Sequence, residues 1–260
     1  MKVAFLTSGG IAPCLSAAIG KLTEIYLQHH PEIEIIGYLN GYKGLLTGKS
    51  VRIPKSLKNN INRFYYFGGS PLGNSRVKLT NITDCIEKGY IKKSENPLEI
   101  AAKQLVKDNV TILHTIGGDD TNITAAELSK YLKENNYNLT VVGLPKTIDN
   151  DVFPINQTLG AWSAAEQGAI FFENIINENT TSDRQLIIHE IMGRNCGWLA
   201  AATALEYRKK LNSNHFIPEL NIVKEKWDIH AIFLPEIKIN FEKEAVRLKK
   251  IMDKYDCVNI

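Results

Sequence analysis

Short apolar runs alternate with longer amphipathic segments over the first half of the chain. Apolar runs bounded by glycine or polar turns are typical of buried strands, and apolar residues at helical spacing are typical of helices. The pattern predicts strands at residues 3–6, 33–38, 51–54, 110–116 and 139–144, and helices at residues 15–27, 97–108 and 122–134. This alternation predicts an α/β fold in which helices cover both faces of a doubly wound parallel sheet.

The rest of the chain predicts a second α/β lobe. A long helix at residues 158–179 leads toward it, and is followed by strands at 185–191 and 229–234 and by helices at 196–208 and 241–253. The composition predicts glycine-rich loops at residues 41–48 and 67–73 and a polar surface loop at residues 212–226. We therefore expect an N-terminal lobe at residues 1–157 and a second lobe at residues 158–260.

The last four residues, Cys257-Val258-Asn259-Ile260, look like the first half of another strand. A natural domain rarely ends with a parallel strand half made, so we expect a C-terminally truncated chain whose second lobe is incomplete. Unpaired apolar strands associate readily. We therefore expect an exposed apolar edge at residues 257–260 and poor solubility of this chain alone.

Composition narrows the class of protein. The 260 residues are 44% hydrophobic and 23% charged, as in an ordinary globular enzyme. The net charge of +3 is too small to indicate nucleic acid or a membrane surface as a partner. The four cysteines are widely spaced, which predicts free thiols in a reducing compartment. No apolar stretch approaches the roughly 20 residues of a membrane span, so we expect a cytoplasmic protein.

Two acidic turns carry the candidate chemistry. Asp119 and Asp120 follow the predicted strand at 110–116, and Asp149 and Asp151 follow the one at 139–144. In an open parallel sheet, ligands bind at the edge where strands end. Carboxylates that lie close together are unfavourable unless they share a cation or a proton. The turns therefore predict a Mg²⁺-assisted phosphoryl-transfer site in which one aspartate is left to act as a base.

Each of these features also has a simpler structural explanation. Gly9 and Gly10 let the backbone approach an anion at a helix N-terminus, or they form a tight strand-to-helix turn without a ligand. Asp119 is either a metal ligand or a helix N-cap. Asx hydrogen bonds alone can hold the turn at 147–151, and Lys146 taken alone would be a solvated surface cation.

Six motifs resemble those of the phosphofructokinase family and follow one another in the same order. They lie at residues 6–14, 68–76, 117–120, 145–151, 192–197 and 234–236. The resemblance covers nearly the whole chain. It implies a phosphofructokinase-like fold, phosphoryl transfer to the 1-hydroxyl of fructose 6-phosphate, Mg²⁺ as the cofactor, and a homo-oligomer, either a dimer or a tetramer.

The resemblance also implies residue roles. Asp149 would take the proton of the sugar 1-hydroxyl, and Asp151 would keep Asp149 in place and tune its charge. Thr147 would hydrogen-bond the sugar or the transferring phosphoryl group. Lys146, together with Arg76, would neutralise the charge that develops during transfer.

Further roles follow from the same motifs. Asp119 would bind the metal ion. The phosphoryl donor would be bound by Gly9, Gly10, Arg76, Gly118 and Asp120. The sugar phosphate would be bound by Thr147, Asp149, Met192, Gly193, Arg194, Glu236 and Arg184, the last donated by a neighbouring subunit. Ile11 and Cys14 depart from the aspartate and glycine common in the family.

Two residues indicate which donor is used. Asp120 and Lys146 are typical of the family's pyrophosphate-dependent members, whereas ATP-dependent members typically have glycine at both positions. A carboxylate at 120 would repel the α-phosphate of a nucleotide, and a lysine at 146 would hold pyrophosphate or the departing phosphate. The alternatives are an ATP-dependent 6-phosphofructokinase, another Gly-Gly-Asp kinase, or an inactive fragment or regulatory subunit.

Overall fold

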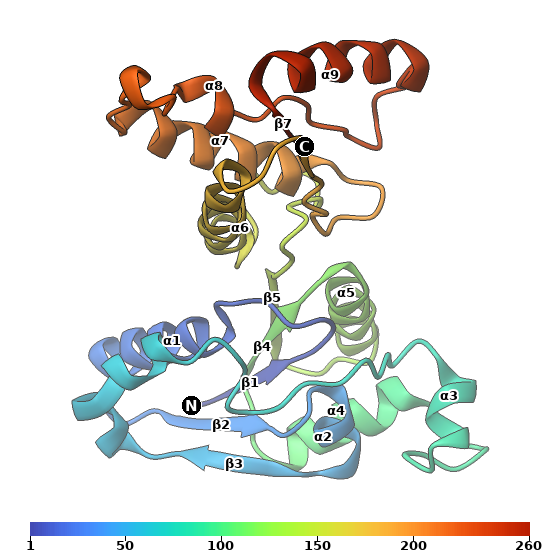
Figure 1. The fold of residues 1–260 in the computed structure, drawn as a ribbon. Coiled ribbons are helices and arrows are strands. Elements are labelled where there is room, and N and C mark those ends of the chain that lie inside the picture. Colours follow the sequence, from blue (N-terminus) through green and yellow to red (C-terminus); the bar gives the residue numbers. More distant parts are fainter. The chain divides into compact units, whose positions relative to one another are not determined.

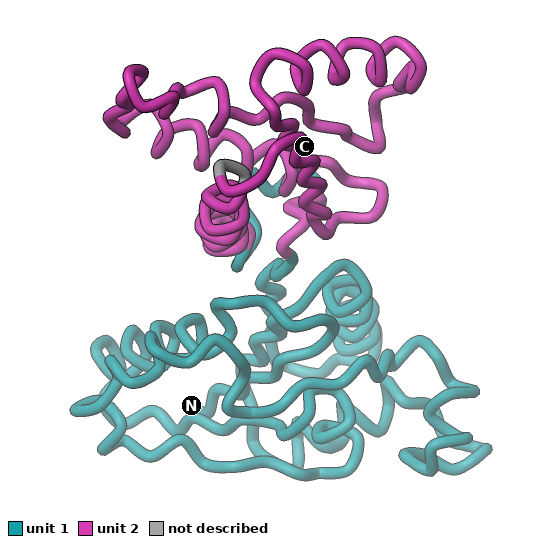
Figure 2. The backbone as a smooth tube through the Cα atoms, viewed as in Figure 1, with its two compact units in different colours: residues 1–147, 152–160 teal, residues 148–151, 161–260 magenta. Residues whose placement is uncertain are grey.

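The structure, a computed structural model, describes residues 1–178 and 181–260, which divide into two compact units (Figure 2). Unit 1 comprises Met1–Thr147 and Val152–Gly160. Unit 2 comprises Ile148–Asp151 and Ala161–Ile260. The chain therefore passes between the units three times, and the short turn that carries Asp149 belongs by its contacts to unit 2.

Unit 1 is built on a five-stranded sheet in the order β3-β2-β1-β4-β5 (Figure 1). The strands are β1 (Lys2–Thr7), β2 (Glu34–Tyr38), β3 (Ser50–Ile53), β4 (Ile112–Gly117) and β5 (Thr140–Pro145). All neighbours pair in parallel except β2 and β3, which are antiparallel at one edge. The register places Gly117 opposite Pro145, so β4 and β5 end at the same edge of the sheet.

Alternation along β1 explains why helices cover both faces. Val3 and Phe5 belong to one hydrophobic core with α1 (Leu15–His29), whereas Ala4 and Leu6 belong to the other. The first core also receives η1 (Lys55–Tyr66). The second core receives α2 (Tyr42–Thr47), α4 (Pro97–Lys107) and α5 (Asp119–Glu134), with α3 (Ile82–Glu87) beside them. Because successive strand residues point to opposite faces, one apolar strand supplies both cores.

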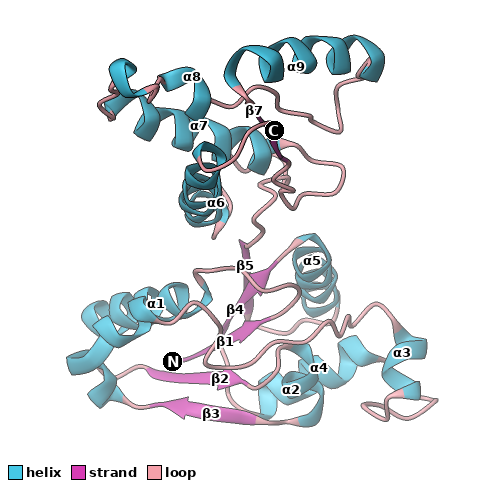
Figure 3. Ribbon diagram, viewed as in Figure 1, coloured by secondary structure: helices cyan, strands magenta, loops and turns pink.

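Unit 2 is mostly helical (Figure 3). Its helices are α6 (Ala161–Ile176), η2 (Asn177–Thr180), α7 (Trp198–Ser213), η3 (Pro218–Leu220), α8 (Lys224–Trp227) and α9 (Phe241–Tyr255). Its strands, β6 (Gln185–Ile187) and β7 (Cys257–Asn259), form a parallel pair. Buried alanines let α6 pack closely on α7, and the ring of Phe172 meets that of Tyr207 edge-on at 4.9 Å.

The predicted α/β fold class is confirmed, but several element predictions were wrong. Residues 41–48, predicted as a loop, contain α2, which is flanked by Gly41 and Gly48 at positive φ. The polar loop predicted at 212–226 contains η3 and α8, and η1 and α3 were not predicted. Helix α5 begins at Asp119, three residues before the predicted start, so both aspartates of the first acidic turn lie in its first turn.

The predicted strand at 229–234 is absent from the described structure. His230 N donates to Asn259 O at 2.8 Å, but the imidazole Nδ1 of His230 accepts the N–H of Asn259 at 2.9 Å. The imidazole thus takes the Asn259 N–H, which a parallel ladder would direct to the Asp228 carbonyl oxygen, and the described residues of the two segments share one backbone hydrogen bond. Strand β6 is also shorter than predicted and ends at Ile187.

The predicted exposed apolar edge at residues 257–260 is also wrong. The side chains of Cys257, Val258 and Asn259 are buried. Asn259 Nδ2 donates to the carbonyl oxygens of Lys226 and Asp228, both at 2.9 Å. One side of β7 thus pairs with β6 and the other is covered by the segment that follows α8.

All four cysteines are free thiols, two of them buried. Among the described residues, we find no helix that combines the length and the apolar character needed to cross a membrane.

Candidate active site

The loop between β1 and α1 is tied to the glycine-rich segment that precedes Arg76. Gly9 has a φ of +84°, which a residue with a side chain would adopt only with strain. Its N–H donates to Ser75 O at 2.9 Å. Asn74 Nδ2 donates to the carbonyl oxygens of Gly9 at 2.8 Å and Gly10 at 3.2 Å. A Cβ on Gly10 would meet nothing within 4 Å, so this side of the loop is open to a ligand.

Lys146 lies beneath this loop instead of on the surface. It follows β5 directly, is only 2% exposed, and donates from Nζ to the Gly10 carbonyl oxygen. Its backbone N–H donates to Gly117 O at 2.8 Å, which continues the register of β4 and β5. Burial lowers the pKa of the Lys146 ammonium; the Cys14 thiol opposes that shift and the Arg76 charge adds to it. The alternative of a solvated cation is therefore excluded for Lys146.

The first acidic turn forms the N-terminus of α5. Gly118 is the N-cap, without a side-chain capping bond, and Asp119 is the first helical residue. Asn122 Nδ2 holds the turn by donating to Gly117 O at 2.8 Å and Gly118 O at 2.9 Å. Asp119 is therefore not the N-cap, and both aspartates gain from the positive end of the helix dipole.

The two aspartates of this turn differ in their surroundings. Asp119 is exposed at the sheet edge, whereas the Asp120 carboxylate forms an ion pair with Lys78 at 2.8 Å. No group of three or more histidine, cysteine or carboxylate side chains suited to a metal occurs within residues 1–178 and 181–260. Mg²⁺ commonly takes only one or two protein carboxylates and completes its shell with water and substrate phosphate oxygens. An exposed Asp119 fits that requirement as a single protein ligand.

Two further predicted residues belong to unit 1. Arg76 is exposed and close enough to Lys146 for its charge to act on that ammonium. Thr147 is half-buried, and its carbonyl oxygen accepts a hydrogen bond from Thr158 Oγ1 at 2.7 Å. Arg76 and Thr147 thus lie in the same unit as the Gly9–Gly10 loop, Lys146 and the first acidic turn. The residues predicted to bind the phosphoryl donor therefore gather at one edge of the sheet of unit 1.

The second acidic turn packs within unit 2. Asp149 is half-buried, and its carbonyl oxygen accepts from Cys196 Sγ at 3.3 Å. Burial raises the pKa of the Asp149 carboxyl, the charge of Asp151 raises it further, and Arg194 opposes the rise. Asp151 is exposed. The structure thus brings Asp149, Asp151 and Arg194 into one electrostatic group.

The segment from Met192 to Gly197 adopts an unusual backbone. Gly193 has a φ of +147°, and a Cβ there would overlap the Cys196 carbonyl oxygen, so only glycine fits. Arg194 follows with a positive φ of 51°. Met192 is 73% exposed and contributes little to the core. These positions present Met192 and Arg194 at the surface of unit 2.

Glu236 has a structural contact that the sequence did not reveal. Its Oε1 accepts the N–H of Gly197, the N-cap of α7, at 2.7 Å. Arg184, which was predicted to bind the sugar phosphate, forms an ion pair with Asp253 of α9 at 3.0 Å. The structure therefore joins Glu236 to the 192–197 segment but pairs Arg184 with a residue outside the predicted site.

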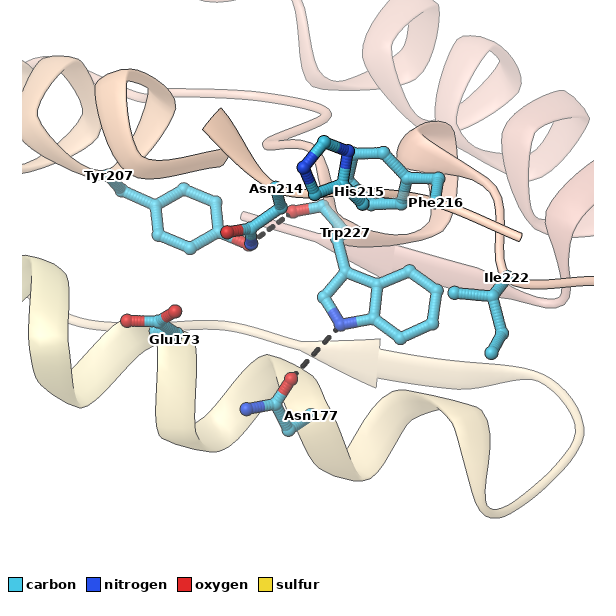
Figure 4. Close-up of a pocket in the computed structure, with 8 residues that line it drawn as sticks. All are labelled: Glu173, Asn177, Tyr207, Asn214, His215, Phe216, Ile222 and Trp227. Atoms are coloured by element: carbon cyan, nitrogen blue, oxygen red, sulfur yellow. Dashed lines mark hydrogen bonds between the residues drawn. The ribbon is translucent and has the colours of Figure 1, made fainter. Parts of the chain in front are cut away.

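A cavity of about 290 Å³ lies elsewhere in unit 2 (Figure 4). It is lined by Glu173, Asn177, Tyr207, Asn214, His215, Phe216, Ile222 and Trp227. Trp227 Nε1 donates to Asn177 Oδ1 at 3.0 Å, and the Tyr207 hydroxyl donates to Trp227 O at 2.6 Å. None of the predicted site residues lines this cavity.

Sequence reasoning missed two residues of unit 1, Asn74 and Lys78. Asn74 lies two positions before Arg76, inside a motif that had been identified, but its partner Gly9 lies 65 residues away. Lys78 follows the same motif by two positions and pairs with Asp120. Their positions beside Arg76 mark both as candidates, but the sequence carries no signal for their partners.

The sequence model of the family described as Phosphofructokinase matches residues 2–256. The chain therefore belongs to the phosphofructokinase family. A protein of Methylomonas methanica, named pyrophosphate–fructose 6-phosphate 1-phosphotransferase, is 58% identical over 259 residues, which is 100% of this chain and 63% of that protein. A protein of the same name from Methylotuvimicrobium alcaliphilum is 57% identical, again over 100% of this chain and 63% of its own length. The chain thus spans less than two thirds of these relatives.

Solved structures agree on the fold. The crystal structure of a pyrophosphate-dependent phosphofructokinase from Marinobacter aquaeolei superposes with a TM-score of 0.75, at 24% identity, over 100% of this chain and 59% of that one. At this identity the likeness shows the fold alone.

Proposed function

We propose that the chain acts in the Mg²⁺-dependent transfer of a phosphoryl group from pyrophosphate to the 1-hydroxyl of fructose 6-phosphate, giving fructose 1,6-bisphosphate and phosphate. One observation carries the proposal most directly. The Lys146 ammonium is buried directly under the Gly9–Gly10 loop. A buried cation is unfavourable unless it is paired with an anion. A small inorganic phosphoryl donor bound on this loop would be that anion. The relatives described above carry the name of this reaction.

Unit 1 would bind the donor. Gly9, Gly10 and Gly118 would let the phosphates approach the backbone, and Arg76 would neutralise them from the exposed side. Asp120 would disfavour a nucleotide because its carboxylate would face the additional phosphate. Mg²⁺, held by Asp119 and by donor phosphate oxygens, would supply charge neutralisation at the transferring group. Transfer from pyrophosphate would lie near equilibrium, so the reaction would run in both directions.

Asp149 would act as the general base. Its carboxylate would take the proton of the 1-hydroxyl as that oxygen bonds to phosphorus, and the bond from phosphorus to the leaving phosphate would break. The raised pKa of Asp149 suits this role, because a carboxylate with a higher pKa accepts a proton more readily. Asp151 would keep Asp149 in place, and Thr147 would hydrogen-bond the reacting groups.

The sugar phosphate would be held by Met192, Gly193 and Arg194. Glu236 would accept sugar hydroxyl hydrogen bonds through Oε2, since Oε1 caps Gly197. Arg184 would act across a subunit contact in a homodimer or homotetramer. We further propose a cytoplasmic location, since the four cysteines are free thiols and the proposed reaction belongs to glycolysis.

The test is an assay of the purified chain with fructose 6-phosphate and Mg²⁺, given either pyrophosphate or ATP, with fructose 1,6-bisphosphate as the readout. We expect turnover with pyrophosphate alone, abolished by Asp149→Asn. Turnover with ATP would overturn the donor assignment. A folded chain that turns over neither donor would favour the alternative of an inactive or regulatory member of the family.

A further inference from the structure

The Gly9–Gly10 loop is held by three hydrogen bonds to two carbonyl oxygens. Asn74 Nδ2 donates to both, at 2.8 Å to Gly9 O and 3.2 Å to Gly10 O. Lys146 Nζ donates to Gly10 O as well. Of the two donors, only the Asn74 amide reaches the Gly9 carbonyl, so the orientation of that peptide depends on Asn74.

The direction of the carbonyls fixes the direction of the amides. Within the described residues the cis peptide bond is Phe153–Pro154, so both loop peptides are trans. In a trans peptide the C=O and N–H bonds point in opposite directions. Because Asn74 and Lys146 draw both carbonyls to one side, the N–H groups of Gly10 and Ile11 face the other side. Gly10 is exposed and Ile11 is 81% exposed, so solvent reaches this part of the loop, and among the described residues neither N–H donates to a backbone carbonyl.

The surroundings of Asn74 favour the side-chain orientation in which Nδ2 donates to the loop. Its Oδ1 is buried and has no hydrogen-bond partner in the described structure. A buried acceptor without a partner is unfavourable. Exchanging the two amide atoms would bring Oδ1 against two carbonyl oxygens, so the orientation with Nδ2 on the loop is the favourable one.

We infer that Asn74 is a positioning residue for the phosphoryl donor, an inference that rests on the proposed function. It turns the Gly9 and Gly10 peptides so that the N–H groups of Gly10 and Ile11 form a concave pair of donors for one phosphate of pyrophosphate. Asn74 itself does not touch the donor. Lys146 stabilises the same orientation by donating to Gly10 O. This lysine would therefore position the loop as well as neutralise the charge of the donor.

The experiment is a titration of ¹⁵N-labelled chain with magnesium pyrophosphate, followed by amide spectra. In the unaltered chain we expect the Gly10 and Ile11 amide signals to shift most. Asn74→Asp places a carboxylate against both carbonyls, so we expect those shifts to be lost and the pyrophosphate Kd to rise at least about tenfold. Asn74→Ala should show a smaller rise in the same direction.

A matched control separates positioning from stability. Asn81 caps α3 in the same unit, where its Oδ1 accepts the Asp84 N–H at 3.2 Å. We expect Asn81→Ala to lower the Tm but to leave the pyrophosphate Kd unchanged. An Asn74 variant that binds pyrophosphate like the unaltered chain, or an unaltered chain whose Gly10 and Ile11 amides do not respond, would overturn the inference.

The titration also separates this inference from the proposed function. Amide shifts that depend on Asn74 in a chain without turnover would support the inference and count against the enzymatic proposal. Turnover with pyrophosphate that is insensitive to Asn74→Asp would do the reverse.

Discussion

Lys78 Nζ lies 2.8 Å from Asp120 Oδ2, so the carboxylate proposed to exclude nucleotides is held by a cation from another part of unit 1. Both side chains are well exposed, at 41% and 66%. An exposed pair of this kind adds little stability. Its importance lies in setting the position and the effective charge of Asp120.

We first predict that Lys78→Met sharpens the preference for pyrophosphate over ATP. Without the neutralising ammonium, the Asp120 carboxylate repels a nucleotide more strongly. The free energy of unfolding should change by less than about 1 kcal/mol. Asp120→Gly should act in the opposite direction and raise ATP use, and adding Lys146→Gly should raise it further. The measurement is kcat/KM for each donor.

Lys130 provides the control for Lys78. It is exposed on α5, the helix that carries Asp120, but lies two to three turns further along. Lys130→Met should leave the donor preference unchanged. If Lys78→Met behaves like Lys130→Met, then the ion pair has no part in donor choice.

The second prediction concerns the pH dependence set by Asp149. The proposed base must be deprotonated to accept a proton, and the pKa of Asp149 is raised above the ordinary value of 3.8, first by burial and then by Asp151. Turnover should therefore be lost, on acidification, at a higher pH than an unperturbed aspartate would give. Asp151→Asn should move this acid limb to lower pH, and Arg194→Met should move it to higher pH. Opposite or absent movements in the pH profile of kcat/KM would contradict the electrostatic grouping.

Asp149 should also reveal a conflict between activity and stability. A carboxyl with a raised folded pKa stabilises the fold below its unfolded pKa, and loses that contribution as pH rises through the folded pKa. At neutral pH, Asp149→Asn should therefore leave the Tm unchanged or raise it, while abolishing turnover. The difference in Tm should shrink on acidification below the ordinary pKa of aspartate. A marked loss of Tm at neutral pH would indicate a structural role instead.

Local periodicity accounts for most of what could be predicted of the fold. Strands β1, β4 and β5 are apolar runs with clear ends, so both their existence and their parallel arrangement could be predicted. Helix α2 was missed because Gly41 and Gly48, which bound it at positive φ, resemble the composition of a loop. The run at 229–234 has the apolar character of a strand, but among the described residues its pairing with β7 is a single backbone hydrogen bond, from His230 N to Asn259 O.

The candidate site likewise has features that could be predicted from local sequence and features that could not. The sequence could predict that Asp119 and Asp149 follow strand ends, because strand ends are local features. It could not predict that Lys146 is buried, since its partner, Gly10 O, lies 136 residues away. Nor could it predict that Glu236 caps α7, a contact that needs the chain to return over 39 residues. Contacts between loops are determined by tertiary packing, on which hydrophobic periodicity carries no information.

The third prediction tests the cap on α7. Glu236→Ala removes a charged acceptor from the Gly197 N–H and should lower the free energy of unfolding by about 1–2 kcal/mol. Glu236→Gln keeps an acceptor and should cost less than about 1 kcal/mol, mostly from the lost charge near the helix N-terminus. Urea unfolding measures both. Glu242→Ala, in the exposed first turn of α9, is the control, and equal losses at the two positions would argue against the cap.

The fourth prediction concerns a close backbone approach in α2. A Cβ on Gly44 would overlap the Leu39 carbonyl oxygen, which cannot move without disturbing the end of β2. Gly44→Ala should therefore lower the free energy of unfolding by at least about 2 kcal/mol. A Cβ on Gly68 would meet nothing within 4 Å, so Gly68→Ala should change it by less than about 0.5 kcal/mol. Thermal unfolding of the two variants side by side decides the matter, and equal Tm values would refute the steric argument.

The division of the chain into Met1–Thr147 with Val152–Gly160, and Ile148–Asp151 with Ala161–Ile260, limits how the two units can be exchanged. A cut after Thr147 leaves Val152–Gly160 on the wrong fragment, and a cut after Gly160 leaves Ile148–Asp151 on the wrong one. No single crossover can therefore graft a complete unit 1 or unit 2 from a relative. A chimera that keeps both the turn around Asp149 and Val152–Gly160 with their own packing partners needs three junctions, and a single junction after Gly160 would couple the proposed base to a foreign scaffold.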